Sequence, residues 1–174
     1  MPPYKLVLHL KIVLAALLIA SAPSASALAE SGTPAVVVGE PQKLPKSPLT
    51  IRTASGKKLK YTVEVAATPE QQAVGLMFRA SMPQDSGMLF VYKTPQPLAF
   101  WMENTYLPLD LIFIGQDGRI LNVAANAKPL SRQPILSAGQ AIGVLEINGG
   151  QAATLGIAPG DRVEHPRLAV SRGK

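Results

Sequence analysis

Short segments in which apolar residues alternate with polar ones recur along the chain from Leu49 onward, and this pattern is typical of β-strands. The clearest case is the 58–66 segment, where apolar residues occupy every second position between Leu59 and Val65. One face of this strand is therefore expected in the core and the other in water. The 49–54 segment and the turn residues that follow it complete a predicted β-hairpin.

Further apolar segments predict the remaining strands, at 87–92, 98–103, 109–114, 119–125, 140–147 and 160–165. The Asp117-Gly118 pair predicts a tight hairpin between two of them. A loop is expected at Pro95 and Pro97, and a longer one over 126–138.

Two short helices are expected between the strands. Thr68 is a suitable N-cap, Pro69 follows at the first helical position, and Gln71 completes a capping box. This helix is predicted to end between residues 76 and 78. A second helix is expected over 151–156, closed by Gly156.

This succession of strands, turns and short helices predicts a mainly β domain over 49–168, a single compact antiparallel β-sandwich or barrel with one or two short helices. Four prolines within 30–48 predict a linker, although the valines at 36–38 could pair as a short strand. Residues 169–174 form a basic tail.

The N-terminus has the pattern of a signal peptide over residues 1–29. Lys5 and Lys11 precede an apolar run at 12–20, which is shorter than the roughly 20 residues that span a bilayer. Two overlapping Ala-x-Ala patterns follow, and cleavage is expected after Ala29. The alternative is an uncleaved anchor. The protein is thus expected to be exported by the general secretory route to the periplasm or beyond.

The composition excludes several kinds of chemistry. The chain has no cysteine, and beyond the signal segment its one histidine is His165, so thiol catalysis and cysteine-ligated metal sites are excluded and a serine-histidine triad is not expected. No phosphate-binding glycine loop is present, and neither a cofactor nor a metal is predicted. Four methionines, at positions 77, 82, 88 and 102, have irregular spacing that favours packing over copper binding.

The net charge of +6 does not predict a nucleic-acid partner. The basic excess lies in 30–58 and 169–174, whereas residues 59–168 carry a net charge of −1. A nucleic-acid surface is expected on the folded domain rather than in the tails.

Candidate site residues gather around the 100–110 segment. Trp101 is the one tryptophan, and Asp110 lies in an apolar strand, on the face of residues 112 and 114. Glu146 raises the same question in a second apolar strand. A buried carboxylate must be neutralised, paired or hydrogen-bonded. Arg79 is the predicted partner of Asp110 or Glu146, with Asn104 and Thr105 as alternative hydrogen-bond donors.

Several motifs resemble the exported members of the domain of unknown function 192 family. These motifs are GLMFR at 75–79, GMLF at 87–90, FWMENT with LPLD at 100–110, IFIGQDGRI at 112–120, VLEI followed by glycine at 144–149, and GIAPGDRV at 156–163. The resemblance covers residues 58–166 and implies a compact all-β domain with short helices, but no established activity. The six candidates fit the family pattern, whereas Glu103 stands where the family often has lysine.

Three functional interpretations follow. In the structural one, Asp110 accepts hydrogen bonds from the 104–107 turn, Arg79 pairs with a carboxylate, and Trp101 fills the core. In the second, the domain is a binding module in which Arg79, Trp101, Asn104, Thr105, Asp110 and Glu146 contact a small polar ligand, glycan or peptide. In the third, it is a hydrolase that uses Asp110 and Glu146 as acid and base, which requires both carboxyls across one cleft.

Overall fold

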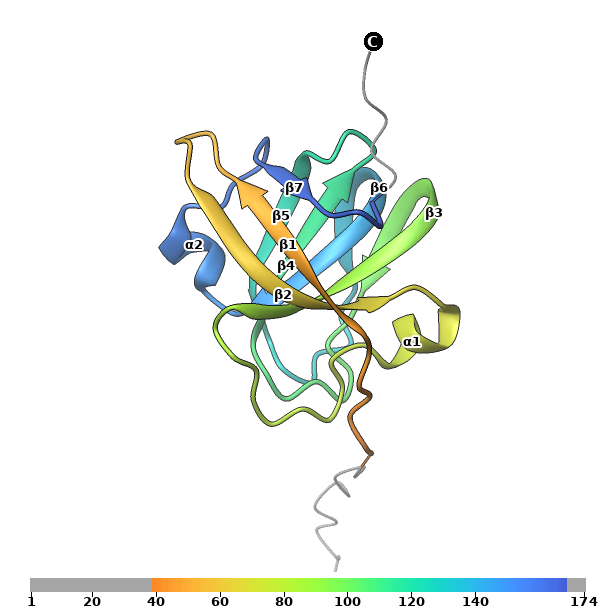
Figure 1. The fold of residues 1–174 in the computed structure, drawn as a ribbon. Coiled ribbons are helices and arrows are strands. Elements are labelled where there is room, and N and C mark those ends of the chain that lie inside the picture. Colours follow the sequence, from red (N-terminus) through yellow and green to blue (C-terminus); the bar gives the residue numbers. More distant parts are fainter. Residues whose placement is uncertain (1–38, 169–174) are drawn as a thin grey trace, which may run out of the picture. The chain divides into compact units, whose positions relative to one another are not determined.

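A single seven-stranded sheet forms the body of the domain (Figure 1). The computed structural model describes residues 39–168. The strands are β1 (Lys46–Arg52), β2 (Lys58–Ala66), β3 (Ser86–Phe100), β4 (Leu109–Gly115), β5 (Ile120–Ala127), β6 (Ile135–Asn148) and β7 (Arg162–Glu164), and the helices are α1 (Pro69–Val74) and α2 (Gln151–Leu155). The strand order is β5-β4-β6-β3-β2-β1-β7. The predicted mainly β fold with two short helices is confirmed.

The sheet is curled rather than split into two layers. An isolated bridge between Arg119 and Arg162 connects the residue before β5 to β7, so the two margins of the sheet meet at one end. All neighbouring strands are antiparallel except β2 and β3, which α1 connects as a parallel pair. The architecture is therefore barrel-like, with one parallel pair that the sequence did not indicate.

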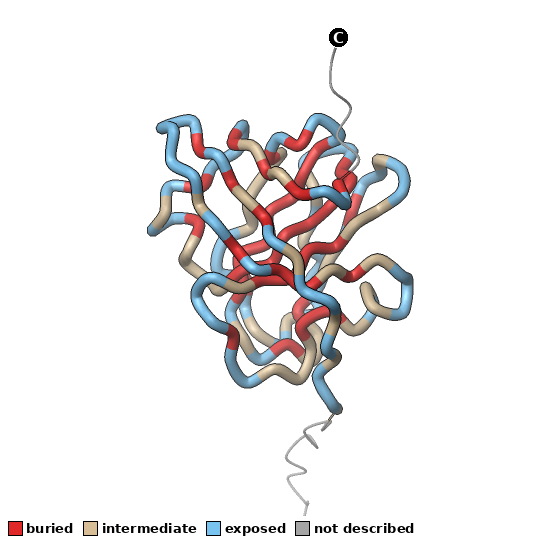
Figure 2. The backbone as a smooth tube through the Cα atoms, viewed as in Figure 1, coloured by how far each residue is buried: buried red, intermediate tan, exposed pale blue. Residues whose placement is uncertain are grey.

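Both faces of the sheet carry an apolar cluster. One cluster contains Val63, Ile112 and Ile147, and the other contains Met88 and Phe113. Figure 2 shows that the buried backbone follows the strands, while the loops between them are largely exposed. A residue's place in the strand alternation therefore decides which of the two clusters its side chain joins.

Several local predictions are confirmed. β1 and β2 form the predicted hairpin, with Leu49 opposite Tyr61. The capping box of α1 is present, because the Thr68 side chain accepts a hydrogen bond from the Gln71 amide and the Gln71 side chain accepts one from the Thr68 amide. The β4–β5 turn places Gly118 at φ 81°, a conformation that glycine adopts readily.

The predicted loop at Pro95 and Pro97 is wrong, because β3 continues through it. β2 pairs with β3 only as far as Phe90, so the second half of β3 is hydrogen-bonded to β6 alone. Proline is tolerated there, since an edge strand has backbone positions that need no partner. β6 is correspondingly longer than predicted, and the expected loop at 126–138 shrinks to 128–134.

Three other boundaries also differ from expectation. α1 ends at Val74, because Gly75 has φ 51° and leaves the helix earlier than predicted. β1 begins at Lys46 rather than at Leu49. The 98–103 strand ends at Phe100, which leaves Trp101 outside the sheet.

The polar face of β2 is not entirely in water, which corrects the expectation from its alternation. Glu64 is buried, because the chain around residues 42–44 and Arg79 covers it. The predicted signal peptide, the linker residues up to 38 and the basic tail lie outside the described residues. Within residues 39–168, no helix is long and apolar enough to cross a membrane.

Candidate functional site

The first feature of the site is the buried carboxyl of Glu146. It lies on β6, directly between Met88 of β3 and Leu111 of β4, and its residue is 4 % exposed. No hydrogen bond or ion pair joins its carboxyl to another residue of the 39–168 region. Burial raises the pKa of Glu146 to about 8, because the charged form is poorly solvated there.

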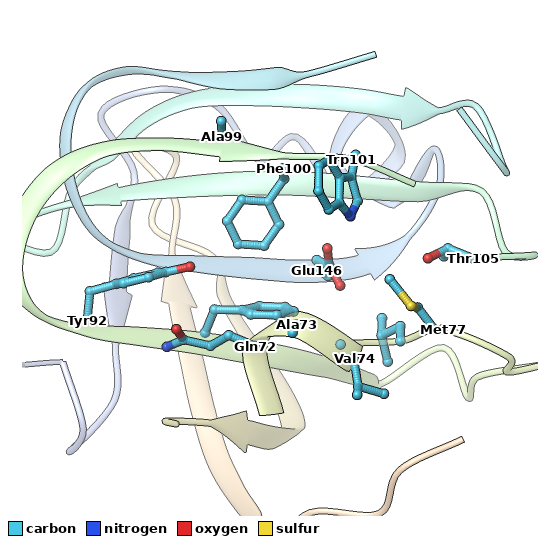
Figure 3. Close-up of a pocket in the computed structure, with 13 residues that line it drawn as sticks. Gln72, Ala73, Val74, Met77, Tyr92, Ala99, Phe100, Trp101, Thr105 and Glu146 are labelled. Atoms are coloured by element: carbon cyan, nitrogen blue, oxygen red, sulfur yellow. The ribbon is translucent and has the colours of Figure 1, made fainter. Parts of the chain in front are cut away.

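A cavity of about 200 Å³ opens beside Glu146. It is lined by residues from α1 and the segment after it, from β3 and the segment after it, and from β6: Gln72, Ala73, Val74, Gly75, Leu76, Met77, Phe90, Tyr92, Ala99, Phe100, Trp101, Thr105 and Glu146. Figure 3 shows the Glu146 carboxyl near the middle of this group, with Phe100 and Trp101 on one side and Val74 and Met77 on the other. The carboxyl is thus buried in the protein but accessible from the cavity.

Trp101 forms part of the cavity wall and is 56 % exposed. It directly follows the last residue of β3, where the chain leaves the sheet. The expectation that Trp101 fills the core is therefore wrong. An exposed indole beside a cavity is instead a surface on which an apolar or aromatic group can pack.

Hydrogen bonds between loops hold the cavity wall in place. The Phe78 amide donates to the Asn104 carbonyl at 2.9 Å, and the Leu130 amide donates to the Thr105 carbonyl at 3.2 Å. Phe78, Asn104 and Leu130 all have positive φ, at 64°, 52° and 62°. Such conformations cost about 1–3 kcal/mol each for residues other than glycine, and they often occur at functional sites.

Two neutral polar side chains of the wall each donate a hydrogen bond to a backbone carbonyl of the protein. The Thr105 hydroxyl donates to the Glu103 carbonyl, and Gln72 Nε2 donates to the Val91 carbonyl. Tyr92 is a third polar group of the wall, and burial together with the nearby charge of Glu146 raises the pKa of its hydroxyl to about 12. Tyr92 therefore stays protonated at neutral pH.

Asp110 belongs to the opposite face of the sheet and is fully buried, as its alternation predicted. Its carboxylate accepts hydrogen bonds from three backbone amides, those of Asn126 at 2.6 Å, Gly150 at 2.9 Å and Ala152 at 2.7 Å. The expected hydrogen bonds from the 104–107 turn are not the ones it makes. Asp110 instead fastens the end of β5 and the start of α2 to β4.

The two strand carboxyls do not face one another. Asp110 lies opposite Ile147 in the β4–β6 ladder, so Glu146 is one residue out of phase and points to the other face. The condition for the hydrolase interpretation, two carboxyls across one cleft, is not met by Asp110 and Glu146.

Arg79 does not pair with Asp110 or Glu146, and that prediction is wrong. Its guanidinium forms a bidentate pair with Glu64, at 2.8 and 2.7 Å, and donates to the Gln42 carbonyl at 2.7 Å. Burial raises the pKa of Glu64, whereas the hydrogen bonds from Arg79 and from the Leu44 amide lower it. Together the lowering effects are larger, so the pKa of Glu64 lies below its ordinary value. Arg79 thus attaches residues 42–44 to β2.

The sequence model of the DUF192 family, described as an Uncharacterized ACR, matches residues 50–165. The chain belongs to this family. No curated protein sequence matches the chain.

Two solved structures are similar to this DUF192 domain. One is a Sinorhizobium meliloti 1021 protein described as a putative transcription regulator, which is 44 % identical, with a TM-score of 0.69 over 72 % of this chain and 97 % of that one. The other is a protein of unknown function from Novosphingobium aromaticivorans DSM 12444, also 44 % identical, with a TM-score of 0.68 over 75 % of this chain and 96 % of that one.

The structure of the DUF192 domain brings together only some of the six candidate residues. Trp101, Thr105 and Glu146 line the cavity, and Asn104 lies next to it, with its side-chain amide 3.9 Å from the Met77 sulfur. Arg79 and Asp110 lie outside it.

Sequence reasoning missed Gln72, Tyr92 and Phe100 in the cavity wall. Tyr92 could have been found, because alternation along β3 puts it in phase with Met88, which lies beside Glu146. Gln72 could not, since its position depends on how α1 packs.

The remaining residues with possible chemistry have structural surroundings. Met82, Met88 and Met102 are buried in the core, as predicted, whereas Met77 lines the cavity. His165 directly follows the end of β7 and is buried, and its Nδ1 accepts a hydrogen bond from the Arg167 amide. No group of three potential metal ligands occurs within the described part of the chain.

The bidentate Arg79–Glu64 pair leads to a stability prediction for the DUF192 domain. Arg79→Lys keeps the charge but cannot form the same fork of hydrogen bonds, so we expect the free energy of unfolding to fall by about 1–2 kcal/mol. Urea denaturation measures this change. The matched control is Arg52→Lys in the exposed Arg52–Glu164 pair, where a change below about 0.5 kcal/mol is expected. Equal losses in both variants would contradict the structural role of Arg79.

Proposed function

We propose that this DUF192 domain is an exported binding module for a small polar ligand, a glycan or a peptide. The observation that carries the proposal is the unpartnered Glu146 carboxyl, buried at a cavity whose rim holds the exposed Trp101 ring. Ligand sites typically combine an apolar or aromatic wall with a few polar groups that fix the orientation of the ligand. Export is part of the proposal and rests on the signal-peptide pattern of residues 1–29.

The structural interpretation accounts for only part of the candidate set. Both carboxylate oxygens of Asp110 accept hydrogen bonds, and the two terminal nitrogens of Arg79 donate to Glu64 and the Gln42 carbonyl, although Arg79 Nε is buried without a hydrogen-bond partner. Glu146 has no such partner among residues 39–168, and burying a carboxyl without a partner costs stability. Its retention in the core is more easily understood if a ligand supplies the missing partner.

The Sinorhizobium meliloti relative is described as a putative transcription regulator. A protein that binds DNA needs basic residues on its folded surface. The expectation that the basic excess lies in the tails is wrong in part, because Lys46, Arg52 and Lys58 lie on β1 and β2. Residues 39–168 carry 13 basic and 10 acidic residues, a net charge of +3. This excess is small, and we do not extend that description to this chain.

The binding proposal can be tested with the intrinsic fluorescence of Trp101, because the chain contains no other tryptophan. The purified protein is titrated with monosaccharides, amino acids, dipeptides and peptidoglycan fragments, and binding is confirmed by amide chemical shifts in NMR. Binders are expected to shift the Trp101 emission and the amide signals of residues around Glu146. Shifts confined to other parts of the domain would contradict the proposal.

Trp101→Ala is expected to weaken any binder found in this way by at least roughly tenfold, because a large aromatic contact surface is lost. The free energy of unfolding should change by less than about 1 kcal/mol, since the side chain is largely exposed. Affinity is measured by NMR, because the variant lacks the fluorophore. Leu136→Ala is the control, as Leu136 is 60 % exposed but does not line the cavity. Unchanged affinity in Trp101→Ala would argue against this site.

A further inference from the structure

The cavity wall contains one acidic group and no basic one. Among its thirteen residues, Glu146 is the carboxyl, and none is lysine, arginine or histidine. The buried arginine Arg79 is committed to Glu64 and to the Gln42 carbonyl. The positive partner that would stabilise an ionised Glu146 is therefore missing from the wall and has to come from a ligand.

Two of the three neutral polar side chains of the wall, Thr105 and Gln72, also offer hydrogen-bond acceptors, and the hydroxyl of the third, Tyr92, can donate or accept. The Thr105 hydroxyl hydrogen is used by the Glu103 carbonyl, so its oxygen can only accept a further hydrogen bond. Gln72 uses one amide hydrogen on the Val91 carbonyl, and its Oε1 makes no hydrogen bond within residues 39–168. Together with the two oxygens of Glu146, these acceptors suit a group that carries several N–H donors.

Aromatic rings complete the wall. Phe90, Tyr92, Phe100 and Trp101 all contribute to it, and Phe90 and Phe100 pack edge to face at 4.9 Å between ring centroids. The face of an aromatic ring attracts a cation, and tryptophan does so most strongly. A carboxylate and several rings around one small space thus favour a positively charged ligand over a neutral or anionic one.

We propose that the cavity binds the protonated primary amine of a small organic molecule, whose ammonium group hydrogen-bonds to ionised Glu146 while its carbon chain packs against Trp101 and Phe100. This inference rests on the proposed binding function and specifies its ligand class. A dry cavity of about 150 Å³ holds the six carbon atoms of benzene, so 200 Å³ accommodates roughly eight non-hydrogen atoms. A free alkylamine and a lysine side chain share this chemistry.

Binding of a cation is coupled to proton release. With a pKa of about 8, ligand-free Glu146 is mostly protonated at neutral pH, and an ammonium group stabilises the ionised form. The other titratable group of the wall is Tyr92 on β3, which remains protonated. The wall residues from α1 and from the 101–105 segment have no titratable side chain. On the adjoining strands, the residues opposite Glu146 are Met88 and Leu111. The pH dependence of binding should therefore follow Glu146.

The experiment compares four probes that each contain a four-carbon chain by Trp101 fluorescence: n-butylammonium, 1-butanol, butyrate and butyltrimethylammonium. We expect n-butylammonium to bind at least tenfold more tightly than each of the other three. The alcohol lacks the charge, butyrate has the opposite charge, and the quaternary ion has no N–H donor. Nα-acetyl-lysine methylamide is a fifth probe, and its affinity relative to n-butylammonium decides between a lysine side chain and a free amine as the source.

The pH dependence provides an independent readout. From pH 6 to pH 8 the affinity for n-butylammonium should rise by about 50-fold, the increase expected for one ionisation with a pKa of about 8. Calorimetry in two buffers with different ionisation enthalpies should detect the release of about one proton per ligand at pH 7.

Two variants test the role of Glu146. Glu146→Gln should lower the affinity for n-butylammonium by at least tenfold and remove its pH dependence. Glu103→Gln is the matched control, because Glu103 is close to Trp101 in sequence but pairs with Arg132 and does not line the cavity. The control should retain both the affinity and the pH dependence.

Each other outcome overturns a defined part of the argument. If 1-butanol binds as well as n-butylammonium, or if a sugar or an acidic dipeptide shifts Trp101 while the amines do not, the cation inference is wrong and the binding function stands. If no probe and no member of the wider panel perturbs the cavity, both are wrong.

Discussion

Replacing Glu146 with glutamine is expected to remove a decline in stability of about 2 kcal/mol that the unsubstituted protein shows between pH 6.5 and pH 8.5. Burial raises the pKa of Glu146 from an ordinary value of 4.5 to about 8 in the folded protein. Between these two values the folded state holds a proton that the unfolded state has released. The free energy of unfolding therefore falls as the pH rises, by up to about 1.4 kcal/mol per unit. Glutamine cannot ionise, so this slope should disappear.

The chosen pH window isolates Glu146 from other titrating groups. Burial, and then the charge of Arg167, lower the pKa of His165. Titration of His165 therefore reduces the free energy of unfolding only as the pH falls below 6.5, where the unfolded state binds a proton more readily than the folded state. Glu64 has a lowered pKa, and its contribution is likewise lost only in acid. The pKa values of Tyr61 and Tyr92 are raised to about 12, which places their titration above the window.

Urea denaturation at several pH values measures this prediction, and the carbon-13 shift of the Glu146 carboxyl gives its pKa directly. Glu103→Gln is again the control, because Glu103 is more exposed than Glu146 and forms an ion pair with Arg132. This variant should keep the pH dependence of stability that the unsubstituted protein shows. A Glu146 carboxyl that titrates near 4.5 would contradict the buried, unpartnered environment. It would also remove the basis for proton release on ligand binding.

Replacing Asp110 with asparagine is expected to lower the free energy of unfolding by about 3 kcal/mol. The carboxylate accepts three amide hydrogen bonds, two at Oδ1 and one at Oδ2. An asparagine side chain has one oxygen and one NH₂ group, so at least one buried amide would face a donor instead of an acceptor. The loss should be largest in the 126 and 150–152 regions, where amide hydrogen exchange should become faster.

Asp117→Asn is the control, because Asp117 lies in the exposed β4–β5 turn and accepts a 3.0 Å hydrogen bond from the Arg119 amide. A change below about 1 kcal/mol is expected there. Binding of n-butylammonium to folded Asp110→Asn should be unchanged, since Asp110 lies on the opposite face of the sheet from the cavity. A loss of affinity without a loss of stability would contradict its structural assignment.

Local features of the chain could be predicted where a few neighbouring residues decide the structure. The capping box at Thr68 and Gln71 requires only residues three positions apart, and the structure confirms it. The burial of Asp110 followed from its alternation with apolar neighbours in one strand, and it too is confirmed. The strand through Pro95 was not predicted, because proline is acceptable there only where β3 lacks a second neighbour, which depends on where β2 ends.

The candidate site shows the same division. Trp101, Thr105 and Glu146 stood out in the sequence because a single tryptophan and a charged residue in an apolar strand are unusual. Their convergence could not be read from it, since it depends on the pairing of β6 with β3 and on hydrogen bonds between loops such as that from Phe78 to Asn104. The partner of Arg79 was mispredicted for the same reason. Alternation along β2 placed Glu64 on the solvent face, whereas in the structure residues 42–44 cover it.

The sequence by itself determined that the domain is mainly β, that it lacks thiol chemistry, and that Asp110 and Glu146 are placed in apolar strands. Alternation and capping depend on residues close together in the sequence, and composition on the sequence as a whole, so all three can be recognised without knowing the fold. Only the tertiary structure decided that three amides donate to Asp110, whereas Glu146 borders a cavity and has no partner within the described residues 39–168. Those opposite surroundings arise from strand register and from the segments packed over each face, which no local pattern encodes.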